Sequence, residues 1–364
     1  MYTKNQQFLL LLESLRFSKN TIQKFYFNYK FNEDFFKLFE INDDIFPFNK
    51  KEINQIKTAI LNKNHEKFIQ KLNKMKIFCV FYNDDYYPKN YINIDSPPIV
   101  LYTIGDVGLF NNHPLLSVIG TRKPTKYGKL VVDCFVKNLV DASIVTVSDL
   151  AYGIDGFVAS STLEQKGKHI ALLAGGLNSI YPSSHTNLAR QIIKSGGLLV
   201  TEHQPGVKPE ISHFINRNRL LAGLSDGLLL IEAGEKSATI NTVNHAINFG
   251  KELFVIPGNI NSDMSKGTNN LISEIPDSFT ISPNDIINRF GYEVVKSNKN
   301  VVETKMELSH DESIIIDVLF EGELSFDELQ EKTKLNVKTL ATLLTTLEIN
   351  GLIKKLPGNY YEKI

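Results

Sequence analysis

The sequence has no tryptophan, two cysteines and no long apolar run. Two cysteines exclude a disulfide-rich scaffold, and Cys79 and Cys134, each within an apolar stretch, are predicted to be inert, buried side chains. A membrane-spanning helix needs about 20 apolar residues, whereas the run 8–12 ends at Glu13 and lacks a small-residue cleavage site. We therefore expect a cytoplasmic protein with no membrane association.

The sequence also lacks net charge, since 40 Lys and Arg residues balance 40 Asp and Glu residues in 364 residues. This balance hides an uneven distribution. Residues 1–76 carry 14 basic and 8 acidic residues, whereas residues 293–364 carry 9 basic and 13 acidic residues. Because net charge governs association more than fold, the two ends are expected to meet different partners.

The short motifs of common nucleotide-binding and hydrolytic enzymes are absent. There is no G-x-G-x-x-G fingerprint, no G-x-x-x-x-G-K-[ST] phosphate loop, no G-x-S-x-G elbow and no H-E-x-x-H zinc motif. The eight histidines are scattered without metal-ligand spacing. We therefore expect no catalytic residues, no cofactor and no metal.

Residues 1–76 have apolar residues at helical spacing and are predicted to form an N-terminal helical, SAM-like domain. Lysines crowd its last helix, where they form either a solvated face or a contact for nucleic acid.

From residue 115 onward, short apolar runs alternate with amphipathic stretches. Strands are predicted over 115–119, 144–147, 169–173, 198–201, 227–231 and 253–256. Helices are predicted over 127–140, 154–166, 185–194, 218–224 and 239–249. Apolar strands that alternate with helices are typical of a parallel sheet covered on both faces. Residues 77–290 are thus predicted to form an α/β core, a Rossmann-like doubly wound and mostly parallel sheet.

Glycine-rich or polar turns follow these strands, at the sheet edge where ligands bind in such folds. Glycine lets backbone N–H groups approach an anion, although a single glycine turn taken alone more often serves packing than binding. Several turns side by side would follow the phosphates of an extended strand. Arg122, flanked by Lys123, is the candidate phosphate ligand because a guanidinium matches phosphate geometry.

Arg217 and Arg219 lie two positions apart and cannot share one helical face, which predicts an irregular entry into the helix that follows. They either contact phosphate or form structural ion pairs, for instance with Glu232 or Asp226.

Taken in order, these segments resemble the DNA processing protein A family, also called DprA or Smf. The motifs are Gly120-Thr121-Arg122, the segment 148–155, Gly175-Gly176 with Tyr181-Pro182, Arg217-Asn218-Arg219, Glu232 with Ser237, and Gly258 with Gly267. The resemblance covers about residues 80–275. It implies a protein that binds single-stranded DNA without enzymatic turnover, forms homodimers and loads the RecA recombinase in natural transformation.

The resemblance further implies a DNA-binding site on the turns. Its residues are Gly120, Thr121, Arg122, Lys123, Ser148, Gly153, Asp155, Gly175, Gly176, Tyr181, Arg217, Arg219, Ser237, Gly258 and Gly267.

The chain departs from the family pattern within this site. Asp149 and Tyr152 stand where the family usually has glycine and arginine, and Ala159 stands where it usually has histidine. Losing an arginine and gaining a carboxylate weakens the local attraction for phosphate. The affinity is then either reduced or maintained by Tyr152, which would stack on a base, an interaction worth about 1–3 kcal/mol in such sites.

Residues 311–364 have the element order of a winged-helix domain, and residues 291–310 are predicted to be a linker. A capping box, Ser325 with Glu328, begins the second helix. The long helix 337–349 offers Lys338 and threonines rather than the arginine, asparagine and glutamine that read base edges. Together with the acidic charge, this favours contact with a protein or intramolecular packing over the reading of duplex DNA.

Two other functions stay open. One is an enzyme resembling the nucleotide phosphoribohydrolases, although Pro257-Gly258-Asn259-Ile260 only approaches their P-G-G-x-G-T-x-x-E motif. The other is a transcription-type regulator that binds duplex DNA through the winged helix.

Overall fold

A computed structural model describes residues 2–29, 34–41, 46–291, 309–349 and 352–363. The chain forms two compact units, Met1–Ser297 and Asn298–Ile364. Most of the linker predicted at 291–310 lies outside the described residues. The predicted boundary at residue 76 lies within the first unit and stays a prediction.

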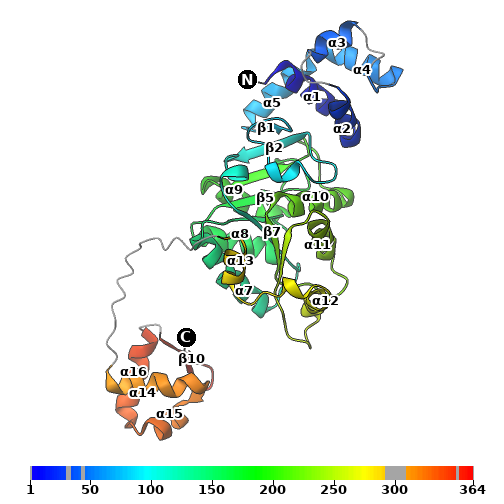
Figure 1. The fold of residues 1–364 in the computed structure, drawn as a ribbon. Helices are drawn as coiled ribbons and strands as arrows, with labels where there is room; N and C mark the ends of the chain where they lie inside the picture. The colour runs from blue at the N-terminus through cyan, green and yellow to red at the C-terminus, as the bar shows by residue number, and fades with distance from the viewer. Residues whose placement is uncertain (1, 30–33, 42–45, 292–308, 350–351, 364) are drawn as a thin grey trace. The chain divides into compact units, whose positions relative to one another are not determined.

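Helices open the first unit, as the apolar spacing predicts (Figure 1). They are α1 (Lys4–Ser14), α2 (Lys19–Asn28), α3 (Phe35–Ile41), α4 (Lys50–Leu61) and α5 (Asn64–Lys74). Thr3 and Asn49 form capping boxes at the starts of α1 and α4, which satisfy N–H groups that have no intrahelical partner. Phe8 is fully buried, with its ring 5.6 Å from that of Phe25 and 5.9 Å from that of Phe35. Aromatic packing therefore holds these helices together.

An eight-stranded sheet follows, with the strand order β1-β2-β6-β5-β4-β3-β7-β8 in the described residues. The strands are β1 (Phe78–Phe81), β2 (Val100–Gly105), β3 (Leu115–Ile119), β4 (Val145–Ser148), β5 (His169–Leu172), β6 (Leu198–Thr201), β7 (Gly227–Leu230) and β8 (Glu252–Val255). The six predicted strands occur within one residue of their expected bounds, and β3 to β8 pair in parallel. Strands β1 and β2, which were not predicted, pair antiparallel at one edge.

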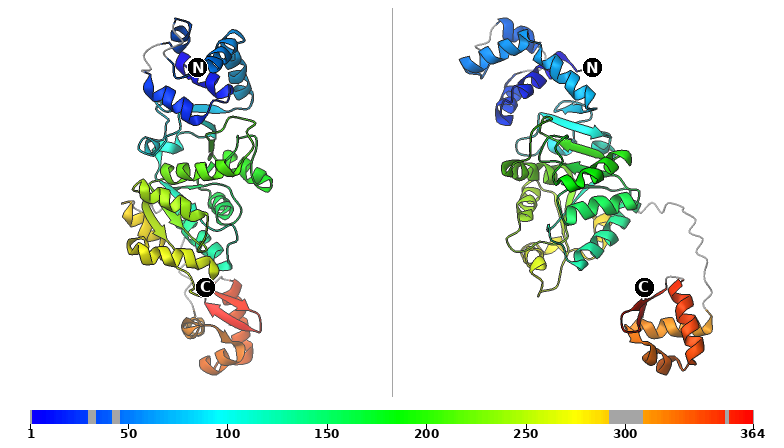
Figure 2. Two further views of the ribbon diagram at one scale, coloured as in Figure 1. Left: turned by 90° about the vertical axis from the view of Figure 1, so that its right-hand side faces the viewer. Right: turned by 180° about the vertical axis from the view of Figure 1, so that it is seen from behind.

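Helices cover both faces of this sheet (Figures 1 and 2). They are α6 (Leu109–Asn112), α7 (Lys126–Asp141), α8 (Ile154–Glu164), α9 (Thr186–Lys194), α10 (Ile211–Leu224), α11 (Thr239–Asn248), α12 (Lys266–Glu274) and α13 (Pro283–Arg289). Val132 of α7 and Val158 of α8 belong to one core cluster, and Leu220 of α10 and Val243 of α11 belong to another. The predicted doubly wound α/β fold is confirmed.

The chain winds outward from β3 in two directions. Strands β4, β5 and β6 lie on one side of β3, and β7 and β8 lie on the other. This reversal is the topological switch point, where open parallel sheets bind ligands beyond the carboxyl ends of their strands.

Two local predictions were wrong. Cys134 is exposed on α7, whereas Cys79 is buried as predicted. Helix α10 begins at Ile211 rather than near residue 218, so Arg217 and Arg219 lie inside a regular helix. No irregular entry is needed, because the two side chains find partners on different sides of the helix.

The second unit has the element order of a winged helix, confirming that prediction. Its elements are α14 (His310–Val318), β9 (Leu324–Ser325), α15 (Phe326–Thr333), α16 (Val337–Ile349), β10 (Ile353–Leu356) and β11 (Tyr360–Lys363). Ser325 and Glu328 form the predicted capping box. Short 3-10 turns also occur in the chain: η2 (Lys89–Tyr91), η3 (Ser183–His185), η4 (Asp263–Ser265), η5 (Pro276–Ser278) and η6 (Leu319–Glu321).

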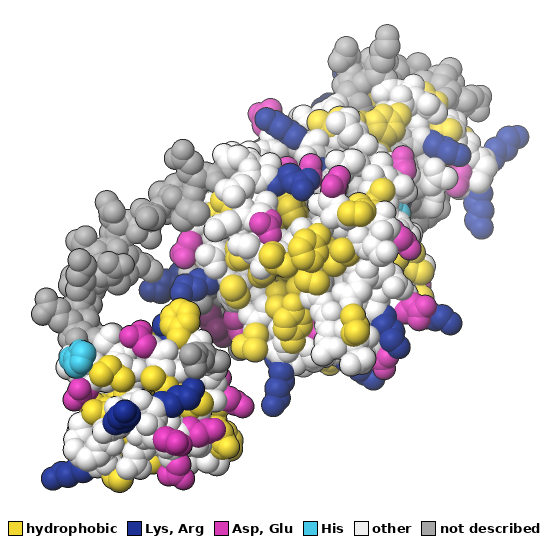
Figure 3. Space-filling model, turned by 60° about the horizontal axis from the view of Figure 1, so that its bottom comes forward, with side chains coloured by type: hydrophobic (Ala, Val, Ile, Leu, Met, Phe, Trp, Pro, Cys, Tyr) yellow, Lys and Arg dark blue, Asp and Glu magenta, His cyan; other side chains and the backbone are white. Residues whose placement is uncertain are grey.

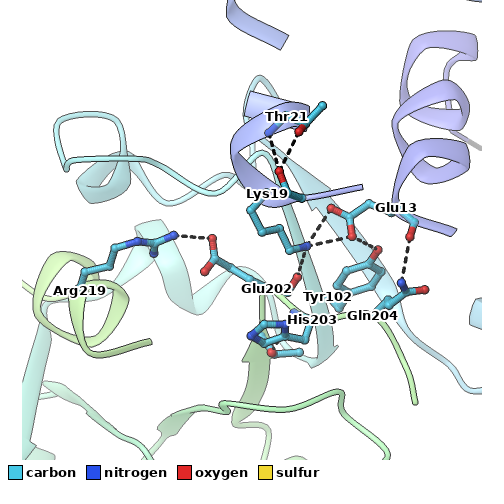
Figure 4. Close-up of polar contacts among 10 residues, drawn as sticks. Glu13, Lys19, Thr21, Tyr102, Glu202, His203, Gln204 and Arg219 are labelled. Carbon is cyan, nitrogen blue, oxygen red and sulfur yellow. Dashed lines mark hydrogen bonds and ion pairs between the residues drawn. The ribbon is translucent and has the colours of Figure 1, made fainter. Parts of the chain in front are cut away.

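A buried polar cluster joins the N-terminal helices to the sheet (Figure 4). The Lys19 ammonium lies 2.8 Å from the Glu13 carboxylate and donates to the Glu202 carbonyl oxygen at 2.5 Å. Gln204 donates to the Glu13 carbonyl oxygen at 2.9 Å, and the Tyr102 hydroxyl donates to the Glu13 carboxylate at 3.3 Å. The carboxylate of Glu13 thus contacts Lys19 of the N-terminal helices and Tyr102 of the sheet.

Replacing Lys19 by methionine is expected to lower the free energy of unfolding by about 1 kcal/mol, because Glu13 stays buried without its cation. The loss is moderate because 39% of the Lys19 side chain is exposed and water can partly replace the ammonium. Chemical denaturation measures this change. Lys4→Met is the matched control, since the Lys4–Asp34 pair has an exposed lysine, and a loss as large as that of Lys19→Met would contradict the role of the buried cluster.

Candidate nucleic-acid interface

An open cleft of about 370 Å³ lies at the switch point, between the loops after β3, β4 and β7 and one side of α10. Its lining residues are Ile119, Gly120, Thr121, Arg122, Lys123, Asp149, Ala151, Asp155, Phe214, Ile215, Arg217, Asn218, Leu221, Ser237, Ala238, Thr239 and Thr242. The cleft brings together seven of the fifteen predicted site residues: Gly120, Thr121, Arg122, Lys123, Asp155, Arg217 and Ser237.

Backbone contacts fix the loop that carries Arg122 and Lys123. The Thr121 N–H donates to the Glu232 carbonyl oxygen at 2.8 Å, and the Ile154 N–H donates to the Thr121 carbonyl oxygen at 3.1 Å. Gly153 has φ of +84°, and a Cβ at this position would overlap the Thr121 carbonyl oxygen, so glycine is required here. The loops after β3, β4 and β7 therefore position one another.

Arg122 and Lys123 are the available cations of the cleft. Both side chains are exposed, and neither has an ion-pair partner among the residues that the structure describes. Their charge is therefore free to meet an anion in the cleft.

Glu232 caps the start of α7 instead of pairing with Arg217. Its carboxylate accepts from the Thr125 N–H at 2.9 Å and from the Thr125 hydroxyl at 2.5 Å. A carboxylate near the first turn of a helix is stabilised by the helix dipole, which suits a residue that is 1% exposed.

Arg217 is neutralised within the cleft wall. Its Nη1 donates to the Leu172 carbonyl oxygen at 2.9 Å, and its Nη2 donates to the Asp149 carboxylate. Burial raises the pKa of Asp155 well above its usual range, and the charge of Asp149 raises this pKa further. The cleft thus contains three cationic side chains, those of Arg122, Lys123 and Arg217, beside the carboxyl groups of Asp149 and Asp155.

Arg219 does not lie at this cleft. It pairs with Glu202 at 2.7 Å and lines a separate cavity of about 350 Å³ together with Lys19. The ion-pair partners suggested from the sequence, Glu232 and Asp226, were therefore wrong for both arginines. The folded partners are Asp149 for Arg217 and Glu202 for Arg219.

The other predicted site glycines pack against protein. The Gly176 N–H donates to the Val207 carbonyl oxygen at 2.9 Å, and a Cβ on Gly175 would lie 3.0 Å from Pro209. The Gly258 N–H donates to the Asn269 side chain at 3.0 Å. The Gly267 N–H donates to the Ala233 carbonyl oxygen at 2.9 Å. These four glycines hold neighbouring loops close together.

Ser148 is also engaged within the core. Its hydroxyl donates to the Asp155 carbonyl oxygen at 3.2 Å and lies 3.1 Å from Nε2 of His169. These contacts tie the loop after β4 to the buried core of the sheet.

Two half-exposed tyrosines are adjacent to residues that line the cleft. Tyr181 is 52% exposed, and its ring packs edge-on against Phe214, which lines the cleft, at 5.4 Å. Tyr152 is 50% exposed and follows the lining residue Ala151, and its ring packs edge-on against that of His185 at 5.3 Å. Exposed aromatic rings beside cations are the usual stacking surfaces for unpaired bases.

Sequence reasoning missed the lining residues on α10. Phe214, Asn218 and Leu221 share one side of the helix with Arg217 at spacings of three and four. Recognising that α10 begins at Ile211 would have identified this side.

The long helix of the second unit, α16, has few groups to offer to base edges. The hydroxyls of Thr342, Thr345 and Thr346 each donate to the carbonyl oxygen four residues earlier, at 2.9 to 3.0 Å. These bonds turn the oxygens of the three threonines toward the helix itself.

Among the described residues, no helix is long and apolar enough to cross a membrane. Within the same part of the chain, no group of three or more His, Cys, Asp or Glu side chains is arranged to hold a metal ion.

Comparison with known proteins finds one family for the core and a related one for the second unit. The family described as DNA recombination-mediator protein A matches residues 78–291. The DprA winged helix domain matches residues 302–359.

Individual relatives agree with these matches. The DNA processing protein DprA of Bacillus subtilis is 35% identical over 227 residues, which cover 60% of this chain and 76% of that protein. A crystal structure of DNA processing protein A from Streptococcus pneumoniae superposes with a TM-score of 0.61 at 27% identity, over 80% of this chain and 99% of that one. The protein from Helicobacter pylori, described for its single-stranded DNA binding mode, superposes with a TM-score of 0.53 at 29% identity, over 60% and 97%.

Proposed function

Because the chain belongs to the DNA recombination-mediator protein A family, we propose that it binds single-stranded DNA at the cleft and delivers this DNA to recombination. One observation carries this proposal: Arg122 and Lys123, both unpaired within the described structure, stand on a fixed loop in an open cleft. Phosphates would lie along this loop, and bases would stack on Tyr152 and Tyr181.

The proposal includes loading of the RecA recombinase in natural transformation, in the cytoplasm and without enzymatic turnover. Family membership supports this part, since proteins named DNA processing protein DprA occur among the relatives. The geometry of the cleft supports binding rather than turnover: Asp155 is buried, and Asp149 is engaged with Arg217.

We propose that the protein acts as a homodimer through an exposed hydrophobic surface of the first unit. Figure 3 shows hydrophobic side chains gathering on one face of this unit. Large hydrophobic residues near its β8 edge are well exposed, among them Ile260 at 83% and Ile281 at 66%. Contiguous exposed apolar surface supports protein association. A molar mass of one chain by light scattering at micromolar concentration would contradict the dimer.

The second unit is proposed to contact protein rather than to read duplex DNA. The inward-bonded threonines of α16 and the acidic charge of residues 293–364 support this role. Tight, sequence-specific duplex binding would instead support the transcription-type regulator.

A gel-shift assay on the full chain tests the central proposal. Short single-stranded DNA should bind more tightly than duplex DNA of the same length, with little dependence on sequence. The affinity should fall steeply between 50 and 200 mM salt, because each phosphate contact releases counterions. Equal affinity for both DNA forms would contradict the proposal, and release of free base from a nucleoside monophosphate would favour the phosphoribohydrolase-like enzyme.

A further inference from the structure

Asp149 occupies the place of an external anion in the cleft wall. One of its carboxylate oxygens accepts from the Arg217 guanidinium, and the other accepts from the Ala151 N–H at 2.7 Å. Both residues of the ion pair line the cleft, with 13% of the Asp149 side chain and 5% of the Arg217 side chain exposed. A guanidinium and a backbone amide are the donors that proteins use to hold phosphate.

Arg217 retains hydrogen-bonding capacity that the fold does not use. Its Nη1 and Nη2 are engaged, whereas its buried Nε has no hydrogen-bond partner in the described structure. Buried donors without a partner are uncommon in folded proteins, and such a group points to a ligand. An anion that contacted Nε and Nη2 together would satisfy that edge of the guanidinium.

We propose that Asp149 is an internal counter-ion that fills a phosphate seat formed by Arg217 and the Ala151 N–H, and that it thereby lowers the affinity for single-stranded DNA. This inference rests on the proposed function of the cleft. It assigns Asp149 as the residue that sets affinity and salt dependence, and a backbone phosphate of the DNA as the ligand that takes the seat when the carboxylate is removed.

Asp155 must be considered in any test of this seat. It lies close to Asp149, and burial together with the charge of Asp149 raises the pKa of Asp155. Removing only the Asp149 charge allows Asp155 to ionise and to replace it. The test therefore uses Asp149→Asn alone and together with Asp155→Asn.

Asp149→Asn is the sharpest substitution, because an asparagine oxygen can still accept from the Ala151 N–H while no charge faces Arg217. We expect Asp149→Asn, or the double variant if Asp155 ionises, to bind single-stranded DNA about 30-fold more tightly at 50 mM salt, as one added charge-assisted hydrogen bond would produce. The slope of log affinity against log salt should steepen by about 0.7, the value for one more phosphate on a single strand.

Glu202→Gln is the matched control. It also removes the carboxylate partner of an α10 arginine, but the Arg219–Glu202 pair lines the separate cavity. Its affinity should stay within about twofold of the wild type, given that the lost charge lies outside the cleft. An equal gain in affinity for single-stranded DNA in Glu202→Gln would show a general charge effect and would contradict the proposed phosphate seat.

The remaining outcomes also decide the question. If Asp149→Asn lowers the melting temperature too far for measurement, Asp149→Ser keeps an acceptor for the Ala151 N–H and serves in its place. Unchanged or weaker binding in the folded single and double variants, with normal binding by the wild type, overturns the seat and leaves the proposed function standing. No binding by the wild type overturns both.

Discussion

Replacing Arg122 by alanine is expected to weaken the binding of single-stranded DNA by about 30-fold at 50 mM salt, the value of one charged hydrogen bond of about 2 kcal/mol. Arg122 is exposed in the cleft and has no ion-pair partner in the described structure, so its full charge is available for phosphate. Arg217 and Arg219, by contrast, are already paired.

The salt dependence should change together with the affinity. Losing one phosphate contact on a single strand lowers the slope of log affinity against log salt by about 0.7. Fluorescence anisotropy with a labelled oligonucleotide at four salt concentrations measures both quantities. A variant with weaker binding but an unchanged slope would indicate that Arg122 acts through the loop and not on phosphate.

Lys137→Ala is the control for Arg122→Ala. It removes the same charge from an exposed position, near the end of α7 that lies away from the cleft loop. Its binding should stay within about twofold of the wild type, because salt screens charges that lie more than a Debye length apart. Equal losses in the two variants would contradict a localised site.

The sheet could be predicted because its signal is local. Each strand from β3 to β7 is a short, mostly apolar run that is buried along its whole length, and β8 differs only in its exposed first residue, Glu252. The turn after each strand is polar or glycine-rich. Strands β1 and β2 escaped prediction because they pair antiparallel at one edge and do not follow the alternation of strand and helix. The start of α10 was not predicted because its N-cap residue, Glu210, makes no side-chain capping bond.

The partners of the two arginines could not be predicted because they depend on the tertiary fold. Asp149 and Arg217 are 68 positions apart, and the loop after β4 brings them together. The prediction of the site glycines was limited for the same reason. The glycines of the turns can be recognised in the sequence, but the loop against which each glycine packs cannot. Gly175 and Gly258 therefore resembled anion seats, whereas in the structure both approach neighbouring protein atoms.

Acid is expected to destabilise the protein through two histidines, His169, which is buried, and His203, which is partly buried. Burial lowers the pKa of His169 to about 3, where its ring nitrogens contact the hydroxyls of Thr146 and Ser148. Burial, with the nearby charge of Lys19, lowers the pKa of His203 to about 3 as well. Below the unfolded-state pKa of about 6.5, the unfolded chain binds protons that the folded chain does not, so each histidine should remove about 2 kcal/mol of stability between pH 7 and pH 5.

Substitutions separate these contributions because their signs differ. His203→Gln and His169→Gln should each shrink the loss of unfolding free energy between pH 7 and pH 5 by about 2 kcal/mol. Asp155 acts in the opposite direction: its pKa is raised in the folded state, so its contribution is present at low pH and is lost as the pH rises. Asp155→Asn should therefore enlarge the acid loss. Urea denaturation at both pH values measures all three variants, and a pH dependence equal to that of the wild type in both histidine variants would show that other groups control acid stability.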